Sequence, residues 1–434
     1  MAASTAHTLL QIIFTFGVFI AFSSTPVLSE PVCVLGSSDN HLLSYLTFHA
    51  SRKFQQLKGV RSYLRRINKP AVKIIESPDG DLIDCVPSHL QPAFDLPQLK
   101  GQKPQDPPER PNGYDSADIL AESFQLWTDS GESCPEGTVP IRRTTEKDVR
   151  RAGSLSKFGR KSFNAQLTKV SSDHENAFAF AGGDRYYGAK VNLNVWKANE
   201  TDLYNFSVSQ AWILSGIFSL PVDDTDIIEA GWEINPKLYG DKFPRFFTHW
   251  TNDLYLTRGC YNLLCSGFVQ TSNRISLGAA ISPRLSQGGR QLDFGIMIWM
   301  DIKHGNWWLE VGPGLVVGYW PSTLFTHLKS HVDMVQFGGM IVRTKSVGMN
   351  SSALMGTDDL SDDGVSKASY FRNLQVVDYF NSLIPLSNFQ LLTIDDISCY
   401  DIKAGRNDVW GNYFHYGGPG GNPQCHGEKN STSA

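Results

Sequence analysis

The stretch LDFGIMIWMDI, residues 292–302, is followed by WWLEVGPGLVVGY, residues 307–319, and together they indicate the fold. Both runs are short, apolar and rich in isoleucine, valine and aromatic side chains, which favour strands. Similar short runs, separated by turn-forming residues, lie at residues 178–180, 190–196 and 206–214. Because no long helical pattern occurs in this part of the chain, it is predicted to form an all-β sandwich or barrel.

The composition is that of a globular protein with much β-structure. The 434 residues are 41% hydrophobic and 19% charged, and the formal net charge is −4. Such a small charge gives no sign of a nucleic-acid-binding protein, and none is expected. Aromatic residues make up 12% of the chain and glycines number 38, which favours strands joined by tight turns.

The N-terminus predicts secretion. Residues 9–22 (LLQIIFTFGVFIAF) form an apolar run that is too short to span a bilayer comfortably. Short residues around Val27 and Ser29 fit cleavage before Glu30. We therefore expect a signal peptide at residues 1–29, a secreted, extracellular protein and no stable membrane insertion. An uncleaved anchor is the alternative, since the segment before the run contains no lysine or arginine.

Seven cysteines in a secreted chain indicate disulfide bonds, with at least one cysteine left over. Cys260 and Cys265 can close a small loop, and Cys399 and Cys425 can tie down the C-terminal tail. The pairing of the other three cysteines stays open. A Cys-x4-Cys pair without a second Cys/His pair is a weak sign of zinc, so no metal and no cofactor is expected. Sequons for N-glycosylation stand at Asn199, Asn205, Asn350 and Asn430.

The region before the strands has a mixed character. A helical spacing of apolar residues is formed by Leu57, Val60, Leu64 and Ile67. The opposite face is basic, and we interpret it as the solvated face of a packed helix rather than a membrane or partner surface. Residues 104–112 (PQDPPERPN) predict an extended linker. The basic residues from Arg142 to Lys161 predict an exposed linker that is open to proteolytic processing.

Carboxylates are the remaining catalytic candidates, because the chain has no nucleophile elbow, zinc-binding HExxH or phosphate-binding loop. Glu229 lies in the apolar, aromatic stretch IIEAGW, residues 227–232. Such surroundings raise the pKa of a carboxyl group, which can then act as a general acid or base. A strand-edge glutamate that points to solvent is the alternative, and composition alone favours it.

Several longer motifs resemble the neprosin family of plant glutamic peptidases. They are residues 228–241 (IEAGWEINPKLYGD), 259–268 (GCYNLLCSGF), 305–309 (GNWWL), 317–321 (VGYWP), 367–373 (KASYFRN) and, near the family's pro-region junction, 134–144 (CPEGTVPIRRT). The resemblance implies an antiparallel β-sandwich peptidase made as a zymogen. It further implies a pair of glutamates that cleaves after proline at acid pH, in a cleft plugged by the pro-region.

The same resemblance implies a division of the chain and its partners. The signal peptide occupies residues 1–29, a smaller mixed α/β pro-region with its linker occupies residues 30–160, and the neprosin-like peptidase domain occupies residues 161–434. The expected partners are the protein's own pro-region and a proline-containing peptide or protein.

Carried over residue by residue, the resemblance makes Glu229 the first catalytic glutamate. The second should stand in a strand that here reads QFGGMIV, residues 336–342, where Met340 takes its place. A thioether cannot transfer a proton, so catalysis is predicted to be impaired. The candidates for aromatic walls that would hold a proline ring are Trp232, Tyr239 and Trp320, and a place in the core is the equal alternative for each.

Two functions remain open. The first is a weak glutamic endopeptidase in which Glu233 or Glu310 replaces the missing partner of Glu229; Glu233 shares the strand face of Glu229 but lies well along the strand. The second is a non-catalytic module that binds proline-containing peptides or cell-wall proteins. A weaker third interpretation is a pro-region that acts alone as an inhibitor after processing.

Overall fold

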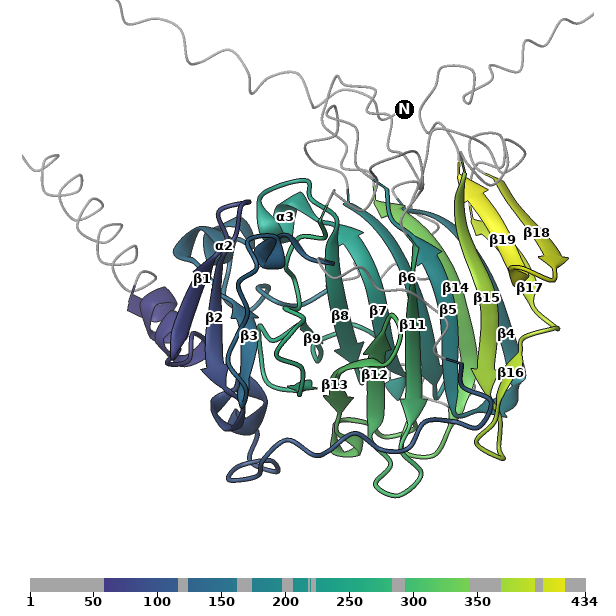
Figure 1. The fold of residues 1–434 in the computed structure, drawn as a ribbon, viewed down its shortest axis with the longest axis horizontal. Coiled ribbons are helices and arrows are strands. Elements are labelled where there is room, and N and C mark those ends of the chain that lie inside the picture. Colours follow the sequence, from purple (N-terminus) through teal and green to yellow (C-terminus); the bar gives the residue numbers. More distant parts are fainter. Residues whose placement is uncertain are drawn as a thin grey trace, which may run out of the picture. The chain divides into compact units, whose positions relative to one another are not determined.

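The structure, a computed structural model, describes residues 58–115, 124–161, 174–196, 206–217, 219, 224–282, 293–342, 368–394 and 401–417. These residues belong to one compact unit, which begins at Leu57. They form two large antiparallel sheets and one small sheet (Figure 1). The prediction of a mainly β chain, with a β-sandwich after a smaller mixed α/β region, is confirmed.

The seven-stranded sheet has the strand order β17-β4-β14-β6-β7-β8-β9. Its strands are β4 (His174–Tyr186), β6 (Phe206–Ser215), β7 (Asp226–Ile234), β8 (Arg245–Thr251), β9 (Cys260–Tyr261), β14 (Val332–Val342) and β17 (Gln390–Ile394). The strand β7, which carries Glu229, therefore lies inside the sheet between β6 and β8.

The nine-stranded sheet has the order β10-β13-β12-β11-β5-β15-β19-β18, and β16 pairs with β15. Its strands are β5 (Gly188–Asn194), β10 (Val269–Gln270), β11 (Asp293–Met300), β12 (Trp307–Val311), β13 (Leu315–Trp320), β15 (Ser369–Val377), β16 (Leu383–Pro385), β18 (Asp401–Asn407) and β19 (Gly411–Gly417). The apolar runs that predicted strands are β11, β12 and β13, which are neighbours in this sheet.

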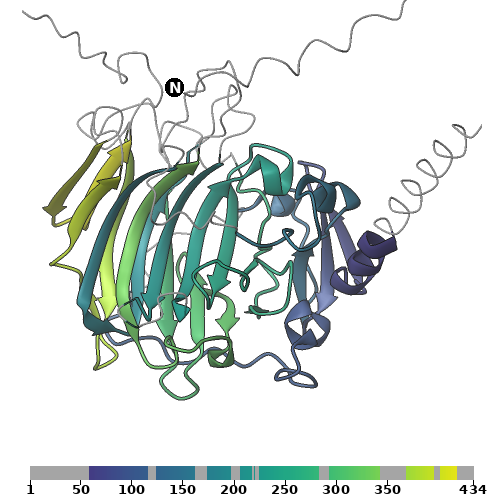
Figure 2. The same cartoon turned by 180° about the vertical axis from the view of Figure 1, so that it is seen from behind.

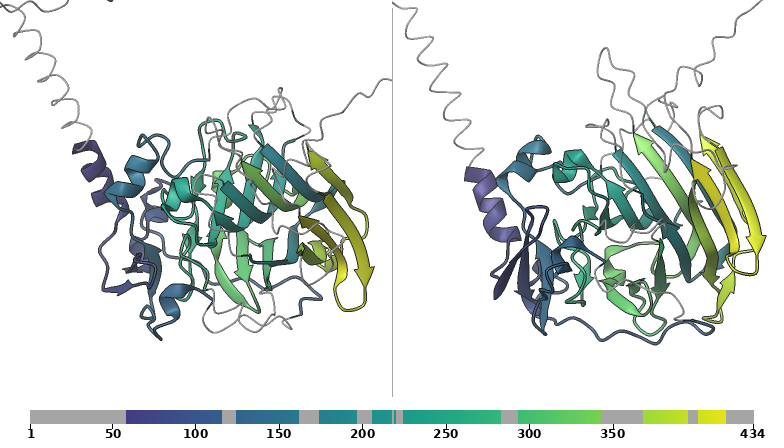
Figure 3. Two further views of the ribbon diagram at one scale, coloured as in Figure 1. Left: turned by 90° about the horizontal axis from the view of Figure 1, so that it is seen from above. Right: turned by 45° about the horizontal axis from the view of Figure 1, so that its top comes forward.

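The main core lies between the two large sheets, which are stacked face to face (Figures 2 and 3). Alternate side chains of a strand point to opposite faces, so each strand sends every second residue into this core. In β7 and β11 the inward side chains are Ile228, Ala230, Trp232, Phe294, Ile296 and Ile298. The residues between them, such as Glu229 and Trp299, lie on the outer faces, and yet both are buried. Other parts of the chain must therefore cover the outer faces.

Much of this cover comes from the N-terminal region. It contains a helix over residues 58–67 and a three-stranded sheet of β1 (Lys73–Glu76), β2 (Leu82–Pro87) and β3 (Thr138–Arg142). The helix confirms the predicted spacing, and its basic face, with Lys58, Arg61, Arg65 and Arg66, is exposed. A disulfide bond between Cys85 and Cys134 joins β2 to the segment before β3.

The ends of two short α-helices are determined by capping residues in the local sequence. The helix α2 (Glu146–Arg151) begins at Thr145, whose side chain accepts from the backbone of Asp148 while Asp148 accepts in return, a capping box. The helix α3 (Pro236–Tyr239) begins at Asn235 and ends at Gly240, which has a φ of 89°. Only glycine adopts this left-handed conformation without strain, so it terminates the helix.

The prediction of an exposed basic linker is wrong for Arg142 and Arg143, whereas Lys147 and Arg150 are exposed. Arg142 belongs to β3 and pairs with Asp81, while Arg143 pairs with Asp84. The acidic partners belong to β2 and the turn before it. Their distance along the sequence gave no sign that they lie beside Arg142 and Arg143. Residues 104–112 have no regular secondary structure, as expected for an extended segment.

The predicted disulfide bond between Cys260 and Cys265 is confirmed. The proposed signal peptide, Cys399, Cys425 and the four sequons lie outside the described residues. Within the described ranges, no helix is both long enough and apolar enough to cross a membrane.

A buried ion cluster attaches the N-terminal sheet to the seven-stranded sheet. Arg245 of β8 is fully buried and contacts Asp79 at 3.0 Å, Asp81 at 2.6 Å and Asp241 at 2.6 Å. Burial would raise the pKa of Asp81, but the charges of Arg245 and Arg142 outweigh it and lower that pKa. Because a buried charge is tolerated only when it is paired, this cluster holds the two sheets in one arrangement.

The cluster should make the protein sensitive to acid. An aspartate whose pKa is lower in the folded state stabilises the fold above its unfolded pKa of about 3.9, and this stability is lost as the pH falls through the folded value. Asp81→Asn should therefore reduce the free energy of unfolding at neutral pH and flatten its decline between about pH 5 and pH 2. Urea denaturation over this range measures both effects, with Asp106→Asn as the control at an exposed aspartate. Equal pH slopes in wild type and Asp81→Asn would contradict the assignment.

Candidate active site

Glu229 lies on the outer face of the seven-stranded sheet. In the strand register it stands between Trp212 of β6 and His249 of β8. The carboxylate is fully buried although it faces away from the main core. A buried ionised carboxylate requires charged or hydrogen-bonding partners.

Four side chains meet the two oxygens of this carboxylate. Lys161 Nζ lies 2.5 Å from Oε2, and the Gln210 amide donates to the same oxygen at 2.7 Å. The Tyr255 hydroxyl donates to Oε1 at 2.6 Å, and His249 Nδ1 lies 3.2 Å from Oε1. Glu229 is thus held by the ammonium of Lys161 and by three further groups, which are an amide, a phenol hydroxyl and an imidazole.

These contacts decide the charge of Glu229. Burial on its own raises its pKa, but the positive charge of Lys161 and the hydrogen bond from His249 outweigh burial. The pKa of Glu229 is therefore held well below the usual range, and the group stays ionised in acid. Burial lowers the pKa of His249, so its imidazole is neutral near pH 7. Since a carboxylate only accepts hydrogen bonds, Nδ1 carries the proton and Nε2 is left as an acceptor.

Tyr255 reaches Glu229 from an unusual backbone conformation. Leu254 and Tyr255 have φ values of 50° and 64°, in the left-handed region that non-glycine residues rarely adopt. Hydrogen bonds from Thr257 and Arg258 to the carboxylate of Asp253 hold this loop in place. The Tyr255 ring stacks on His249 with 5.6 Å between ring centroids. Strain of this kind persists where the surroundings enforce it, commonly at functional sites.

Lys161 comes from the segment after α2. Phe158 is buried against Tyr63 of the first helix, and the backbone carbonyl of Gly159 accepts from Tyr261 of β9 at 2.9 Å. These contacts carry the segment over β9, so that the Lys161 side chain is only 9% exposed. Its ammonium lies 5.3 Å from the centre of the Tyr255 ring. Lys161 therefore occupies the space in front of the carboxylate.

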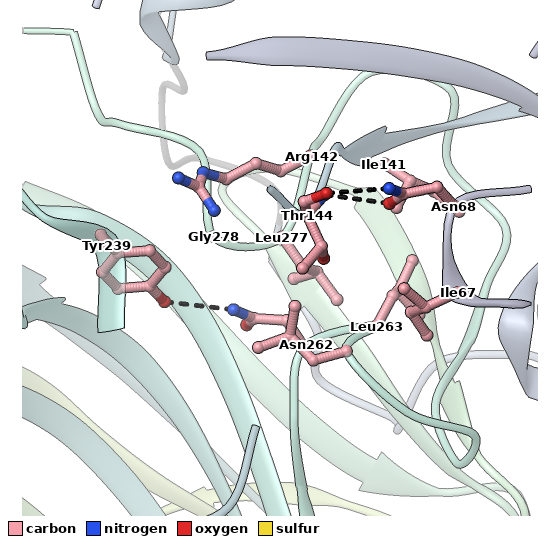
Figure 4. A pocket seen from close by; sticks show the side chains of 11 residues that line it. Ile67, Asn68, Ile141, Arg142, Thr144, Tyr239, Asn262, Leu263, Leu277 and Gly278 are labelled. Atoms are coloured by element: carbon pink, nitrogen blue, oxygen red, sulfur yellow. Dashed lines mark hydrogen bonds between the residues drawn. The ribbon is translucent and has the colours of Figure 1, made fainter. Parts of the chain in front are cut away.

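Glu233 shares the outer face of β7 with Glu229, as predicted. It is fully buried and accepts from the Tyr239 hydroxyl at 2.8 Å. Burial raises the pKa of Glu233 to about 7, so this group is protonated in acid. Tyr239 also accepts from Asn262 at 3.1 Å, beside a pocket whose lining includes Arg142 and Thr144 (Figure 4). This pocket, of about 10 Å³, has room for roughly one water molecule and not for a peptide.

Met340 lies in the same register row as Glu233, with Val208 of β6 between them. It is 4% exposed and packs in an apolar cluster with Val208, Phe247 and Tyr261. No proton-transferring group stands at this position. Glu310, the other suggested substitute, belongs to the nine-stranded sheet, where Arg110 holds it at 2.6 Å.

The three aromatic candidates lie in different places. Tyr239 is beside Glu233, whereas Trp232 points from the other face of β7 into the core and donates to the carbonyl of Asn194 at 2.8 Å. Trp320 is fully buried in the same core against Phe268. The structure therefore brings only Tyr239 of these three to the side of the sheet that carries Glu229.

Sequence reasoning missed four residues of the site, namely Lys161, Gln210, His249 and Tyr255. Gln210 had a usable signal, because it lies in the strand predicted over residues 206–214. Lys161 had none, since it is 68 residues from Glu229 and belongs to a stretch interpreted as a solvated linker.

Comparisons with known proteins agree with the motifs. The sequence profile of the Neprosin domain matches residues 204–419, and that of the Neprosin activation peptide matches residues 74–183. Among solved structures, scytalido-glutamic peptidase with a peptide-based transition-state analogue is 13% identical, covers 57% of this chain and 98% of its own, and has a TM-score of 0.31. SCP-B, a member of the eqolisin peptidases, is 12% identical, covers 57% and 98%, and has a TM-score of 0.29.

These structural likenesses are too distant to bear on the chemistry of the site. The two profiles, in contrast, follow one another in the order activation peptide and then Neprosin domain, and together they account for most of the chain from residue 74 to residue 419. The chain therefore belongs to the neprosin family.

Proposed function

We propose that this protein is a secreted, latent neprosin-type protein with weak, proline-directed peptidase activity. The observation that carries the proposal is the buried Glu229 carboxylate, held ionised and covered by Lys161, without a second acid at position 340. The family membership supports the peptide as substrate. Secretion rests on the apolar run near the N-terminus.

The surroundings of Glu229 support the role of general base. Its carboxylate is ionised in acid, where most carboxyl groups are neutral, so it can accept a proton from a water molecule that attacks the peptide carbonyl. The Gln210 amide and the Tyr255 hydroxyl lie beside it and are neutral at acid pH. The second N–H of Gln210 can donate a hydrogen bond to a substrate oxygen, whereas the single hydroxyl proton of Tyr255 is already donated to Glu229.

The reaction is expected to be slow in the proton transfer that follows the attack of water. A positioned acid is needed to protonate the leaving nitrogen or to support the carbonyl oxygen. A general acid typically increases the reaction rate by about 10²- to 10⁴-fold. Met340 supplies none. Glu233 is protonated, but four residues along a strand separate it from Glu229 by about 13 Å between Cα atoms. One water molecule does not bridge such a gap, so wild-type catalysis is expected to be slow.

Substitution of Met340 tests this account. Met340→Glu should leave the hydrolysis of a proline-containing peptide near pH 3 unchanged, because position 340 lies in the register row of Glu233 and is no closer to Glu229 than Glu233 is. Met340→Gln is the matched control, since it has similar size and polarity without a titratable proton. Rates come from mass spectrometry of the cleaved peptide, with thermal melts to verify folding. A Met340→Glu rate well above that of Met340→Gln would show that an acid at position 340 can serve Glu229, and would refute the distance argument.

Glu229→Gln should abolish the remaining cleavage, because the amide cannot accept the proton of water. The same peptide assay measures this, with Glu233→Gln in parallel. Cleavage that survives in Glu229→Gln would sink the assignment of the base. Loss of cleavage in Glu233→Gln, with unchanged melting temperature, would instead assign the missing acid to Glu233.

Removal of the covering cation should relieve latency. Lys161→Ala takes away the charge 2.5 Å from Glu229 and opens the space before it, so peptide hydrolysis near pH 7 should increase about tenfold, equivalent to 1.4 kcal/mol in the barrier. In acid this gain should disappear, because the loss of Lys161 raises the pKa of Glu229 and neutralises the base. Lys157→Ala is the control, because Lys157 belongs to the same basic stretch and is exposed. If both variants match the wild-type rate, Lys161 does not restrain the site.

A second candidate function is a non-catalytic module that binds proline-containing peptides. The apolar packing of Met340 with Phe247 and Tyr261 favours it, because this cluster stabilises the fold without any acid. Peptide binding without cleavage in every variant above would support this function.

A further inference from the structure

The outer face of the nine-stranded sheet carries a row of aromatic side chains, here called the aromatic face. Trp299 of β11, Trp308 of β12 and Tyr319 of β13 are direct cross-strand neighbours. Their ring centroids are 6.5 Å and 4.6 Å apart along the row. The next row on this face contains Lys190 and Glu310, on either side of Met297. The face thus joins a flat aromatic surface to one positive and one negative charge.

A segment of the same chain covers this face. Residues 91–115, here called the strap, run past the strands from the small sheet toward β16 (Figure 1). Its apolar residues Ala93, Phe94 and Leu99 pack in one cluster with the aromatic row. The strap is rich in proline, with Pro92, Pro97, Pro104, Pro107, Pro108 and Pro111.

The proline-rich half of the strap makes the polar contacts. Gln105, next to Pro104, has a backbone hydrogen bond with the Tyr319 hydroxyl. Arg110 pairs with Glu310 at 2.6 Å and donates to the carbonyl of Gly314 at 2.9 Å.

Tyr114 completes the contacts of this half. It donates to Glu310, and its ring lies 4.9 Å from the ammonium of Lys190. The two charged residues of the aromatic face are therefore both occupied by the strap.

Two donors under the strap are not used. The indole nitrogens of Trp299 and Trp308 are buried, and neither has a hydrogen-bond partner among the described residues. A buried donor without an acceptor costs about 1–3 kcal/mol. A ligand that supplies acceptors at these points would therefore bind this face better than the strap does.

A proline-rich chain has the matching chemistry. In the polyproline II conformation it makes no internal hydrogen bonds, so its carbonyl oxygens are free to accept, and aromatic grooves with indole donors recognise such chains. We propose that the aromatic face is a docking site for a proline-rich segment of a partner protein that carries one basic residue, and that the strap occupies this site in cis. The basic residue of the partner would pair with Glu310, as Arg110 does. This site is separate from Glu229, and the inference does not depend on cleavage.

Peptide binding to the full chain tests the proposal. All proteins carry Glu229→Gln, so that a failure of binding stays distinct from a failure of the proposed peptidase. The probe is a fluorescein-labelled peptide of residues 102–115 (QKPQDPPERPNGYD), measured by fluorescence anisotropy. The double substitution Arg110→Ala and Tyr114→Ala loosens the strap and leaves the aromatic face intact. It should tighten binding about tenfold, because the cis competitor is weakened.

The matched control is the same peptide with its four prolines replaced by alanine, which should bind at least about tenfold more weakly to the loosened protein. Trp308→Phe in the loosened protein should also weaken binding, because it keeps a ring and removes the indole N–H. Equal binding of the two peptides, equal binding before and after loosening, or no binding at all would each overturn the proposal.

Discussion

A buried negative charge is the constraint on which the candidate site depends. Glu229 stands on a sheet face that would be open to solvent if the two large sheets were alone. The chain instead covers this face, and the covered carboxylate must be paired or neutralised. It is paired by Lys161 from the N-terminal side and by Gln210, His249 and Tyr255 from the sheet and its loops. The same ion pair thus fixes the charge of Glu229 and closes access to it.

The N-terminal region has a comparable role on both large sheets. On the seven-stranded sheet it contributes Lys161 and the aspartates that surround Arg245. On the nine-stranded sheet it contributes the strap over Trp299 and Trp308. Each sheet therefore has one face in the shared core and one face that the N-terminal region helps to bury. Functional groups on the outer faces are held in a covered state without any change in the sandwich itself.

The sequence predicted the parts of this arrangement that depend on local pattern. Residues 292–302 and 307–319 are strands because short apolar runs with glycine breaks bury well in a sandwich, and Cys260 and Cys265 are close enough to pair. The direction of the Trp232 side chain could also have been predicted from the sequence. Trp232 is three residues from Glu229, and residues three apart in a strand point to opposite faces. The partners of Glu229 could not be predicted from the sequence, because Lys161 and Tyr255 reach it only through tertiary packing. Arg142 and Arg143 misled for the same reason: their charges look solvated until Asp81 and Asp84 are brought beside them.

The disulfide bond between Cys85 and Cys134 has a topological consequence. The two cysteines are 49 residues apart, and the whole strap lies inside the loop that they close. A single backbone cut within that loop leaves two pieces that remain covalently tethered, so it can free the strap without detaching the small sheet. Cleavage after Lys161 has the opposite result, because the small sheet, the strap and Lys161 then form one piece that is cut from the strands of the two large sheets. The position of the cut therefore determines which of the two outer faces is uncovered first.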